Sequence, residues 1–145
     1  MDEGDQVLAT VPALAETNGD ATERPIGARV SRAMVSVYKT QFGRGPVKAH
    51  THWAGEDILI CVLEDSLTPA EINLRNLGEH ARLRDLRTLF QYSSVKDFVD
   101  PIEEITGRKV RSFLSGIDVA NDVSTETFLF VSRNGEQGPP RTEEG

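Results

Sequence analysis

The stretch Phe42-Gly43-Arg44-Gly45-Pro46-Val47-Lys48-Ala49-His50 joins a segment with helical periodicity to a segment with strand periodicity. Glycine adopts left-handed backbone or allows close approach, and proline then fixes the direction in which the chain enters the strand. The stretch therefore predicts the end of a helix and the start of an extended segment. It also places two permanent cations, Arg44 and Lys48, close to the glycines.

A helix is expected before this stretch, over residues 27–41. The positions that mark one face recur at the three- and four-residue spacing of a helix. They are Val30, Ala33, Met34, Val37, Tyr38 and Gln41. Gly43 is expected to end the helix, because glycine takes the left-handed position beyond a helix without strain.

Two strands and a tight turn are expected after the stretch. Residues 47–53 alternate between apolar or small side chains and the polar Lys48, His50 and His52, which is typical of a half-buried strand. Residues 54–57, Ala-Gly-Glu-Asp, predict a hairpin turn. The continuous apolar run over residues 58–63 predicts a strand in the centre of a sheet, buried on both faces.

The next segment opens with the strongest local helix signal in the chain. Thr68 is the expected N-cap, Pro69 stands at the first helical position and Glu71 completes a capping box. A short helix should run to about residue 77. A longer helical region should follow up to Gly107, with a kink or restart near Asp100 because Pro101 lacks a backbone donor. Its first apolar face is predicted to hold Leu83, Leu86, Leu89 and Phe90.

Two more strands are expected, over residues 109–115 and 125–131, with Gly116 as a turn or bulge and 121–122 as a hairpin connection. The resulting order is helix, strand, strand, helices, strand, strand. Hairpins imply antiparallel neighbours, so the order predicts an α+β two-layer sandwich with an antiparallel four-stranded sheet. Helices would cover one face of the sheet and a partner the other. The pattern leaves the strand order open.

The charge of the chain is unevenly distributed. Residues 1–25 carry a net charge of −5, residues 26–133 carry 14 acids and 14 bases, and residues 134–145 carry −2, which together give the −7 of the whole chain. We interpret residues 1–25 as a disordered acidic leader with a weak turn of helix near 7–15, residues 26–133 as one α+β domain, and residues 134–145 as a disordered tail.

This composition argues against several classes of protein. A neutral domain with acidic tails lacks the clustered cations that nucleic-acid binding needs, and an anionic membrane surface would repel the tails. The single cysteine, Cys61, excludes an intramolecular disulfide and fits a reducing compartment. No signal peptide and no apolar run of membrane-spanning length is seen, so we expect a cytoplasmic protein without direct membrane insertion.

The turn carries the main functional hypothesis. Gly43, Arg44, Gly45, Pro46 and Lys48 could form an anion-binding nest of backbone N–H groups and cations, or a contact surface for a partner. The simpler interpretation is that the turn has only a structural role: the helix ends, a strand begins after the proline, and both cations lie in solvent. The turn is neither a P-loop nor a dinucleotide fingerprint, because it follows a helix and opens a strand.

The other candidates for chemistry are weaker. His50 and His52 share one strand face and could bind a metal with Glu126, although two exposed histidines are the simpler interpretation. Cys61 lies in a strand of core character and has no histidine-containing motif beside it, so no catalytic residue, metal ligand set or cofactor is assigned. A cluster of arginines, Arg82, Arg84 and Arg87, is interleaved with acids and is expected on a solvated helix face.

Four ordered blocks resemble the MpsC-like family, which is named for the small component of a sodium-translocating, membrane-potential-generating system. They are residues 42–49 (FGRGPVKA), 61–71 (CVLEDSLTPAE), 83–90 (LRDLRTLF) and 105–116 (ITGRKVRSFLSG). Members of this family usually carry arginine where this chain has His50, so one positive charge beside the turn is missing.

The resemblance implies a soluble accessory or regulatory domain, and it offers no catalytic residues to transfer. It also implies an association with membrane subunits that transport a cation or bicarbonate. Three readings follow. The first is a non-enzymatic domain that acts by protein contact as a homodimer. The second is a small-anion sensor that uses the turn. The third is an enzyme with Lys48, His50 or Cys61 in its site.

Overall fold

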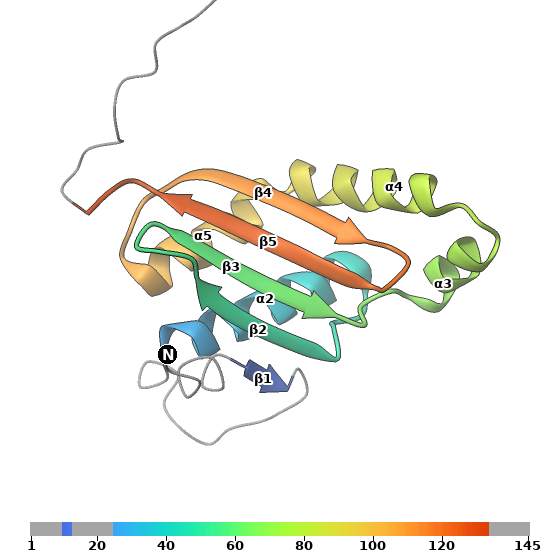
Figure 1. Cartoon of the computed structure of the whole chain (residues 1–145), viewed down its shortest axis with the longest axis horizontal. Coiled ribbons are helices and arrows are strands. Elements are labelled where there is room, and N and C mark those ends of the chain that lie inside the picture. The colour runs from blue at the N-terminus through green and yellow to red at the C-terminus, as the bar shows by residue number, and fades with distance from the viewer. Residues whose placement is uncertain (1–9, 13–24, 134–145) are drawn as a thin grey trace, which may run out of the picture.

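The computed structural model describes residues 10–12 and 25–133. Its elements are β1 (Thr10–Pro12), α2 (Ile26–Phe42), β2 (Lys48–Trp53), β3 (Ile58–Glu64), α3 (Pro69–Asn76), α4 (His80–Ser93), α5 (Val95–Thr106), β4 (Val110–Asp118) and β5 (Val123–Phe130). The strands form one antiparallel sheet in the order β1-β2-β3-β5-β4 (Figure 1). The predicted α+β class is confirmed.

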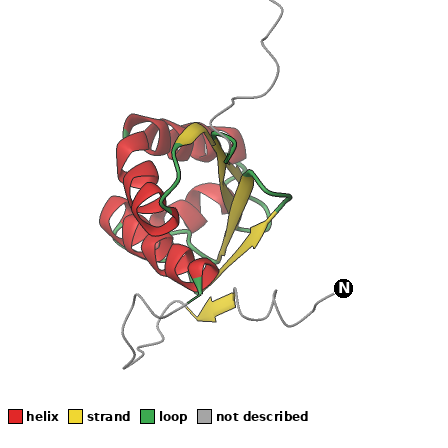
Figure 2. Ribbon diagram, turned by 90° about the vertical axis from the view of Figure 1, so that its left-hand side faces the viewer, coloured by secondary structure: helices red, strands yellow, loops and turns green. Residues whose placement is uncertain are grey.

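The helices gather on one side of the sheet (Figure 2). The sheet lies in front of α2 and α5 in Figure 1, and α4 runs beside β4. Strand β3 pairs with β2 on one side and with β5 on the other, as its apolar sequence predicts. Its inner side chains, Leu59, Cys61 and Leu63, are fully buried, whereas its outer side chains are only partly buried. The second face of the strand is therefore not covered by described residues.

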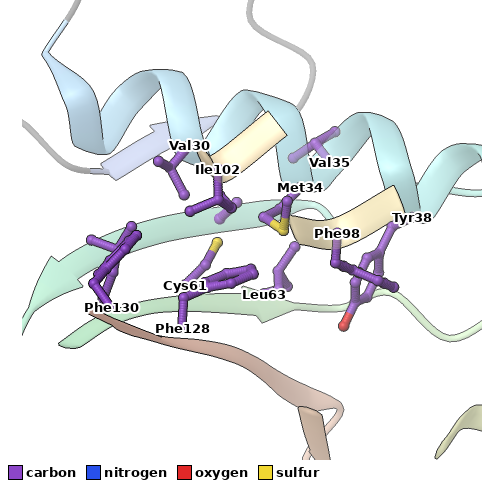
Figure 3. Close-up of a cluster of buried hydrophobic side chains, with 12 residues drawn as sticks. Val30, Met34, Val35, Tyr38, Cys61, Leu63, Phe98, Ile102, Phe128 and Phe130 are labelled. Carbon is purple, nitrogen blue, oxygen red and sulfur yellow. The ribbon is translucent and has the colours of Figure 1, made fainter. Parts of the chain in front are cut away.

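The core lies between α2, α5 and the inner face of the sheet. Figure 3 shows Met34 and Tyr38 of α2 above Cys61 and Leu63 of the sheet, with Phe98 of α5 beside them. The helix face predicted from residues 30 to 38 is the one that packs on the sheet, because apolar side chains at helical spacing are removed from water together.

Two local predictions were wrong. Helix α5 continues through Pro101, and the break between helices lies at Ser94 instead. The buried side chains Phe98 and Ile102 flank the proline and hold the helix against the core. Gly116 lies inside β4 opposite Thr125, and the irregularity of this strand falls between Val110 and Ser112.

A short strand, β1, falls within the segment interpreted as a disordered leader, where a weak turn of helix was expected. Its three residues extend the predicted four-stranded sheet by pairing with β2 at Lys48–His50. The other residues of the leader, 1–9 and 13–24, and the tail 134–145 lie outside the described residues.

Candidate functional site

The turn that follows α2 forms one wall of a pocket. Gly43 adopts a left-handed conformation with φ of 77° and donates its N–H to the carbonyl of Lys39 at 2.9 Å. Gly45 lies so close to α2 that a Cβ on it would stand 2.9 Å from Cγ of Lys39 and 3.3 Å from a methyl of Val35. Between the turn and the helix lies a pocket of about 300 Å³.

The pocket brings together four of the five predicted site residues. Its lining consists of Val35, Lys39, Gly43, Arg44, Gly45, Pro46 and Val47. Lys48 is not among them. It is exposed on β2, on the strand face opposite to that of the buried Ala49, and its cross-strand partner is Glu64. The structure therefore divides the predicted site between a pocket and the outer face of the sheet.

Arg44 binds the loop between β3 and α3. Its Nη1 donates to the carbonyl oxygens of Asp65 and Leu67, each at 2.9 Å, and its Nη2 donates to Oδ1 of Asp65 at 3.2 Å. The side chain is 35% exposed. Arg44 thus holds the loop by its carbonyl groups, which an arginine does well because its donors form a fixed planar fork.

Asp122 also binds the same loop, through the backbone N–H groups of the loop. Its carboxylate accepts hydrogen bonds from the backbone N–H of Ser66 at 3.0 Å and of Leu67 at 3.1 Å. Its backbone carbonyl accepts the N–H of Asp65. Both Asp65 and Asp122 have positive φ, at 60° and 54°, a conformation that non-glycine residues seldom adopt. The loop is held in a tight, fully bonded shape.

Arg87 and Glu71 complete this arrangement beneath the loop. Arg87 donates to the carbonyl of Ser66 at 3.0 Å, and its Nε and Nη2 donate to the two oxygens of Glu71 at 2.7 and 2.6 Å. The guanidinium also lies 3.7 Å from the centre of the Phe42 ring. Glu71 accepts the N–H of Thr68 in the predicted capping box. We call Arg44, Glu71, Arg87 and Asp122, which all bind residues 65–68, the motif clasp.

The Arg87 side chain is fully buried, which contradicts its predicted place on a solvated helix face. Helix α4 turns Leu83, Arg87 and Gln91 inward, at a spacing of four residues. The other members of the predicted apolar face, Leu86, Leu89 and Phe90, are exposed at 41%, 64% and 46%. Burial opposes ionisation of Glu71, but the hydrogen bonds from Arg87 and Thr68 outweigh it and lower the pKa of this carboxyl.

A second buried acid, Glu126, lies in the core. One of its oxygens, Oε2, accepts the hydroxyl of Tyr38 at 2.5 Å and the amide of Gln91 at 2.8 Å. The other, Oε1, receives no hydrogen bond from the described residues, and neither does Oε1 of Gln91. Burial raises the pKa of Glu126 to about 7, although the groups of Tyr38, Ser115 and Gln91 act in the opposite direction. Burial therefore favours the neutral form of this carboxyl.

The histidines do not meet Glu126. His50 and His52 lie on the outer face of β2, with Nδ1 of His50 2.8 Å from Nε2 of His52, and the acid beside His50 is Glu64, at 3.0 Å. Partial burial and the neighbouring His50 lower the pKa of His52. Glu126 faces the other side of the sheet, so it cannot join these histidines in the metal site that is the weaker of the two alternatives. Within residues 10–12 and 25–133, no group of three or more His, Cys, Asp or Glu side chains could hold a metal ion.

Cys61 is unsuited to nucleophilic chemistry. It is fully buried, and burial raises the pKa of its thiol to about 12. Thiolate is the reactive form, so the side chain is inert in the folded protein.

Sequence reasoning missed Lys39 and Val35 of the pocket, and the inward position of Arg87 and the role of Asp122 in the clasp. Lys39 and Val35 precede Gly43 by four and eight residues, and this spacing alone places them on the helix face that the turn meets. No spacing in the sequence indicates that Asp65 and Asp122 take part, because both act through hydrogen bonds between loops that are distant in sequence. The same spacing, applied from Leu83, would have placed Arg87 inside.

The blocks that resemble a family take structural roles. Arg44, the 65–68 loop with Glu71, and Arg87 come from three of the four blocks and meet in the motif clasp. Arg108, from the fourth block, donates to the carbonyl of Val131 at 3.1 Å, is ion-paired with Asp57, and lies 4.8 Å from the centre of the Phe130 ring. Each of these arginines has internal partners.

The comparisons with known proteins give one match. A family model described as "Na+-translocating membrane potential-generating system (MpsC)" matches residues 22–132. No curated protein and no solved structure matches the chain. None of the helices in the described segments has the length and the apolar character that a membrane span requires. The family match covers all the predicted blocks and most of the chain, and the protein belongs to the MpsC family.

Proposed function

We propose that this protein is a cytoplasmic accessory or regulatory domain, without catalytic activity of its own. It acts as a homodimer and by contact with membrane subunits of a cation or bicarbonate transport system, of the kind for which its family is named. The contact site is the turn of Gly43, Arg44, Gly45, Pro46 and Lys48, together with the pocket beside it.

One observation carries this proposal. Three arginines of the motif blocks, Arg44, Arg87 and Arg108, bind carbonyl groups and carboxylates of their own chain, so this part of the motif builds a rigid frame rather than a reactive centre. Next to this frame lies the pocket of about 300 Å³, whose lining includes the exposed Lys39 and the 53% exposed Val47. An apolar floor beside a cation suits a partner side chain of apolar character next to an acid.

The test compares variants of the pocket with a matched control in the native host. Full-length tagged protein is cross-linked in cells and its partners are identified by mass spectrometry. Lys39→Glu and Val47→Glu should lose transport-system subunits that wild type recovers, whereas Lys96→Glu, a reversal of an exposed lysine on α5, should retain them. If all variants recovered these subunits equally, the pocket would not be part of the contact site. If wild type recovered no transport subunit, the accessory role would be contradicted.

The second candidate is a sensor for a small anion at the same pocket. Lys39 and Arg44 both line it, and two neighbouring cations favour bicarbonate, phosphate or a carboxylate. A ligand that binds only the folded protein raises its melting temperature. A thermal shift with one of these anions, lost in Lys39→Ala and kept in Lys96→Ala, would favour the sensor. Lys39 is the better variant, since Arg44→Ala would also release the loop.

A further inference from the structure

Helix α4, which runs beside β4 in Figure 1, is held to the domain differently in its two halves. In the first half, Leu83 packs in a small apolar cluster and the buried Arg87 is bonded to Glu71. In the second half, residues 88–93, the buried side chain is that of Gln91. Among the described residues, the main core cluster contains none from α4. The second half of the helix therefore depends on polar anchors and on ring contacts near the surface.

Two polar anchors attach this half of α4 to the sheet. Nε2 of Gln91 donates to Oε2 of Glu126 at 2.8 Å and to the hydroxyl of Tyr38 at 3.1 Å. The hydroxyl of Tyr92, a side chain that is 41% exposed, accepts the N–H of Ser115 at 2.8 Å. The anchor at Gln91 is the buried one, so its strength depends on how well the polar atoms around Glu126 are paired.

The cluster around Glu126 has more acceptors than donors. Oε2 of Glu126 accepts hydrogen from Tyr38 and Gln91, whereas Oε1 of Glu126 and Oε1 of Gln91 receive none from the described residues. An ionised carboxylate and an amide oxygen are both acceptors, but a protonated carboxyl also carries one O–H donor. Since Oε2 is already occupied, the proton belongs on Oε1. There it supplies the missing donor, to the amide oxygen of Gln91 or to the hydroxyl of Ser115, which lies opposite Glu126 in the sheet.

We propose that Glu126 and Gln91 form a pH-sensitive latch, in which a proton on Oε1 of Glu126 holds the second half of α4 on the sheet and loss of that proton releases it. A buried carboxylate beside an amide oxygen is unfavourable, and water reaches it when one of its covering helices moves away. Of the two helices that bond Glu126, α2 packs on the sheet through the main core and α4 does not, so α4 is the one that moves. The break between α4 and α5 at Ser94, which gives α5 no side-chain cap, is the hinge. The latch is independent of the contact role proposed above.

Glu126 is the group of this cluster whose charge changes near neutral pH. Burial raises its pKa to about 7. The side chains that surround it are Tyr38 of α2, Cys61 of β3, Arg87 of α4, Ser115 of β4 and Ser124 of β5, with the apolar Phe98 of α5 beside Tyr38. Burial raises the pKa of Tyr38 well above its ordinary value and that of Cys61 to about 12, and a guanidinium keeps its proton. A response of the cluster to pH near 7 therefore reports Glu126.

Hydrogen exchange of the full-length protein, measured by mass spectrometry at about pH 5.5 and about pH 8.5, tests the latch. Amides of residues 88–93 should exchange faster than those of α2 and β3 at both pH values, because they open locally. Their protection, corrected for the intrinsic effect of pH on exchange, should fall about tenfold or more between the two, because the open state exposes Glu126 and favours its ionised form. Protection of residues 88–93 that does not change with pH, or that equals the protection of β3 throughout, would overturn the latch.

Two variants assign the effect to the carboxyl. Glu126→Gln has the same shape and cannot ionise, so protection of residues 88–93 should no longer depend on pH. Glu79→Gln, at a partly exposed acid next to the first residue of α4, is the matched control and should keep the wild-type fall. A fall of wild-type size in Glu126→Gln would overturn the latch.

Infrared spectroscopy locates the proton without relying on the motion of α4. The difference spectrum between wild type and Glu126→Gln should contain the band of a protonated carboxyl at about pH 5.5, where an ordinary glutamate is mostly ionised, and should lose it at about pH 8.5. Absence of this band at the lower pH would overturn the latch even if the exchange of α4 varied with pH.

Discussion

Arg87 and Glu71 form a two-pronged ion pair between α4 and α3, in which the arginine side chain is fully buried and the glutamate side chain is 12% exposed. The pair also connects the capping box of α3 to Phe42 of the turn block, through the contact of the guanidinium with the aromatic ring.

Breaking this pair on one side should destabilise the protein strongly. Glu71→Ala leaves a buried guanidinium without its carboxylate and removes the hydrogen bond from Thr68 N–H to the Glu71 side chain in the capping box, so we expect a loss of about 3–5 kcal/mol in the free energy of unfolding. The double variant Glu71→Leu/Arg87→Met should lose less than Glu71→Ala, because it leaves no buried charge unpaired. Chemical denaturation measures both values, and a double variant less stable than Glu71→Ala would contradict this account. Glu79→Ala, at an exposed ion pair with Arg82, is the control and should change stability by less than about 1 kcal/mol.

Glu126 should make the protein less stable as pH rises. Its pKa is about 7 in the folded protein against an ordinary 4.5, so between these values the folded state binds more protons than the unfolded state. The stability that the neutral acid provides is complete below pH 4.5 and is lost as pH rises through 7. At about 1.4 kcal/mol per pKa unit the full loss is about 3 kcal/mol.

Glu126→Gln tests this directly. The amide keeps an acceptor for Tyr38 and Gln91 and cannot ionise, so the variant should gain stability relative to wild type above pH 7 and show no gain near pH 4. The measurement is the free energy of unfolding across this pH range. Glu64→Gln, which changes a partly exposed acid beside His50, is the control variant for this measurement. A stability difference between Glu126→Gln and wild type that is the same at pH 5 and pH 8 would show that the carboxyl does not titrate in this range.

Gly43 and Gly45 are needed for different reasons, and two substitutions separate them. Gly43 has a positive φ and open space around it, so Gly43→Asn should be tolerated better than Gly43→Ala, which should cost about 1 kcal/mol. Gly45 is restricted by contact with Lys39 and Val35, so Gly45→Asn should be at least as damaging as Gly45→Ala. Melting temperatures of the four variants decide this. The proposed difference between the two glycines would be refuted if the Asn variant melted above the Ala variant at both positions, or below it at both.

Cys61 should serve as a reporter of unfolding. Because its thiol is fully buried and its pKa is about 12, a thiol reagent should not modify native protein and should react once per chain in denaturant. The rate of labelling at low denaturant then reports how often the core opens. Fast labelling of native protein would mean that strand β3 is accessible in the folded state.

The sequence was a good guide wherever local chemistry decides structure. The end of α2 at Gly43, the capping box at Thr68 and the central place of β3 all follow from neighbouring residues, and all are confirmed. The fold class follows from the order of these elements, since hairpins and intervening helices admit few architectures.

The buried polar contacts could not be predicted in this way. Apolar periodicity placed Leu86 and Leu89 inside and Arg87 outside, and the structure has the reverse. Arg87 and Gln91 can be buried only because Glu71 and Glu126, 16 and 35 residues away, supply partners for them. Hydrophobic patterns carry no information on such pairing, so the sequence located the motif turn but neither the clasp around it nor the acid in the core.

Strand β1 lies outside residues 22–132, the part of the chain that the family model matches. By pairing with Lys48–His50 it covers backbone groups that would otherwise stand open along the margin of the sheet. Open margins recruit strands from neighbouring molecules and lead to aggregates. A shortened version that begins at residue 22 should therefore keep its core and yet precipitate more readily. In the full-length protein, the three-residue strand would prevent β2 from pairing with strands of other molecules.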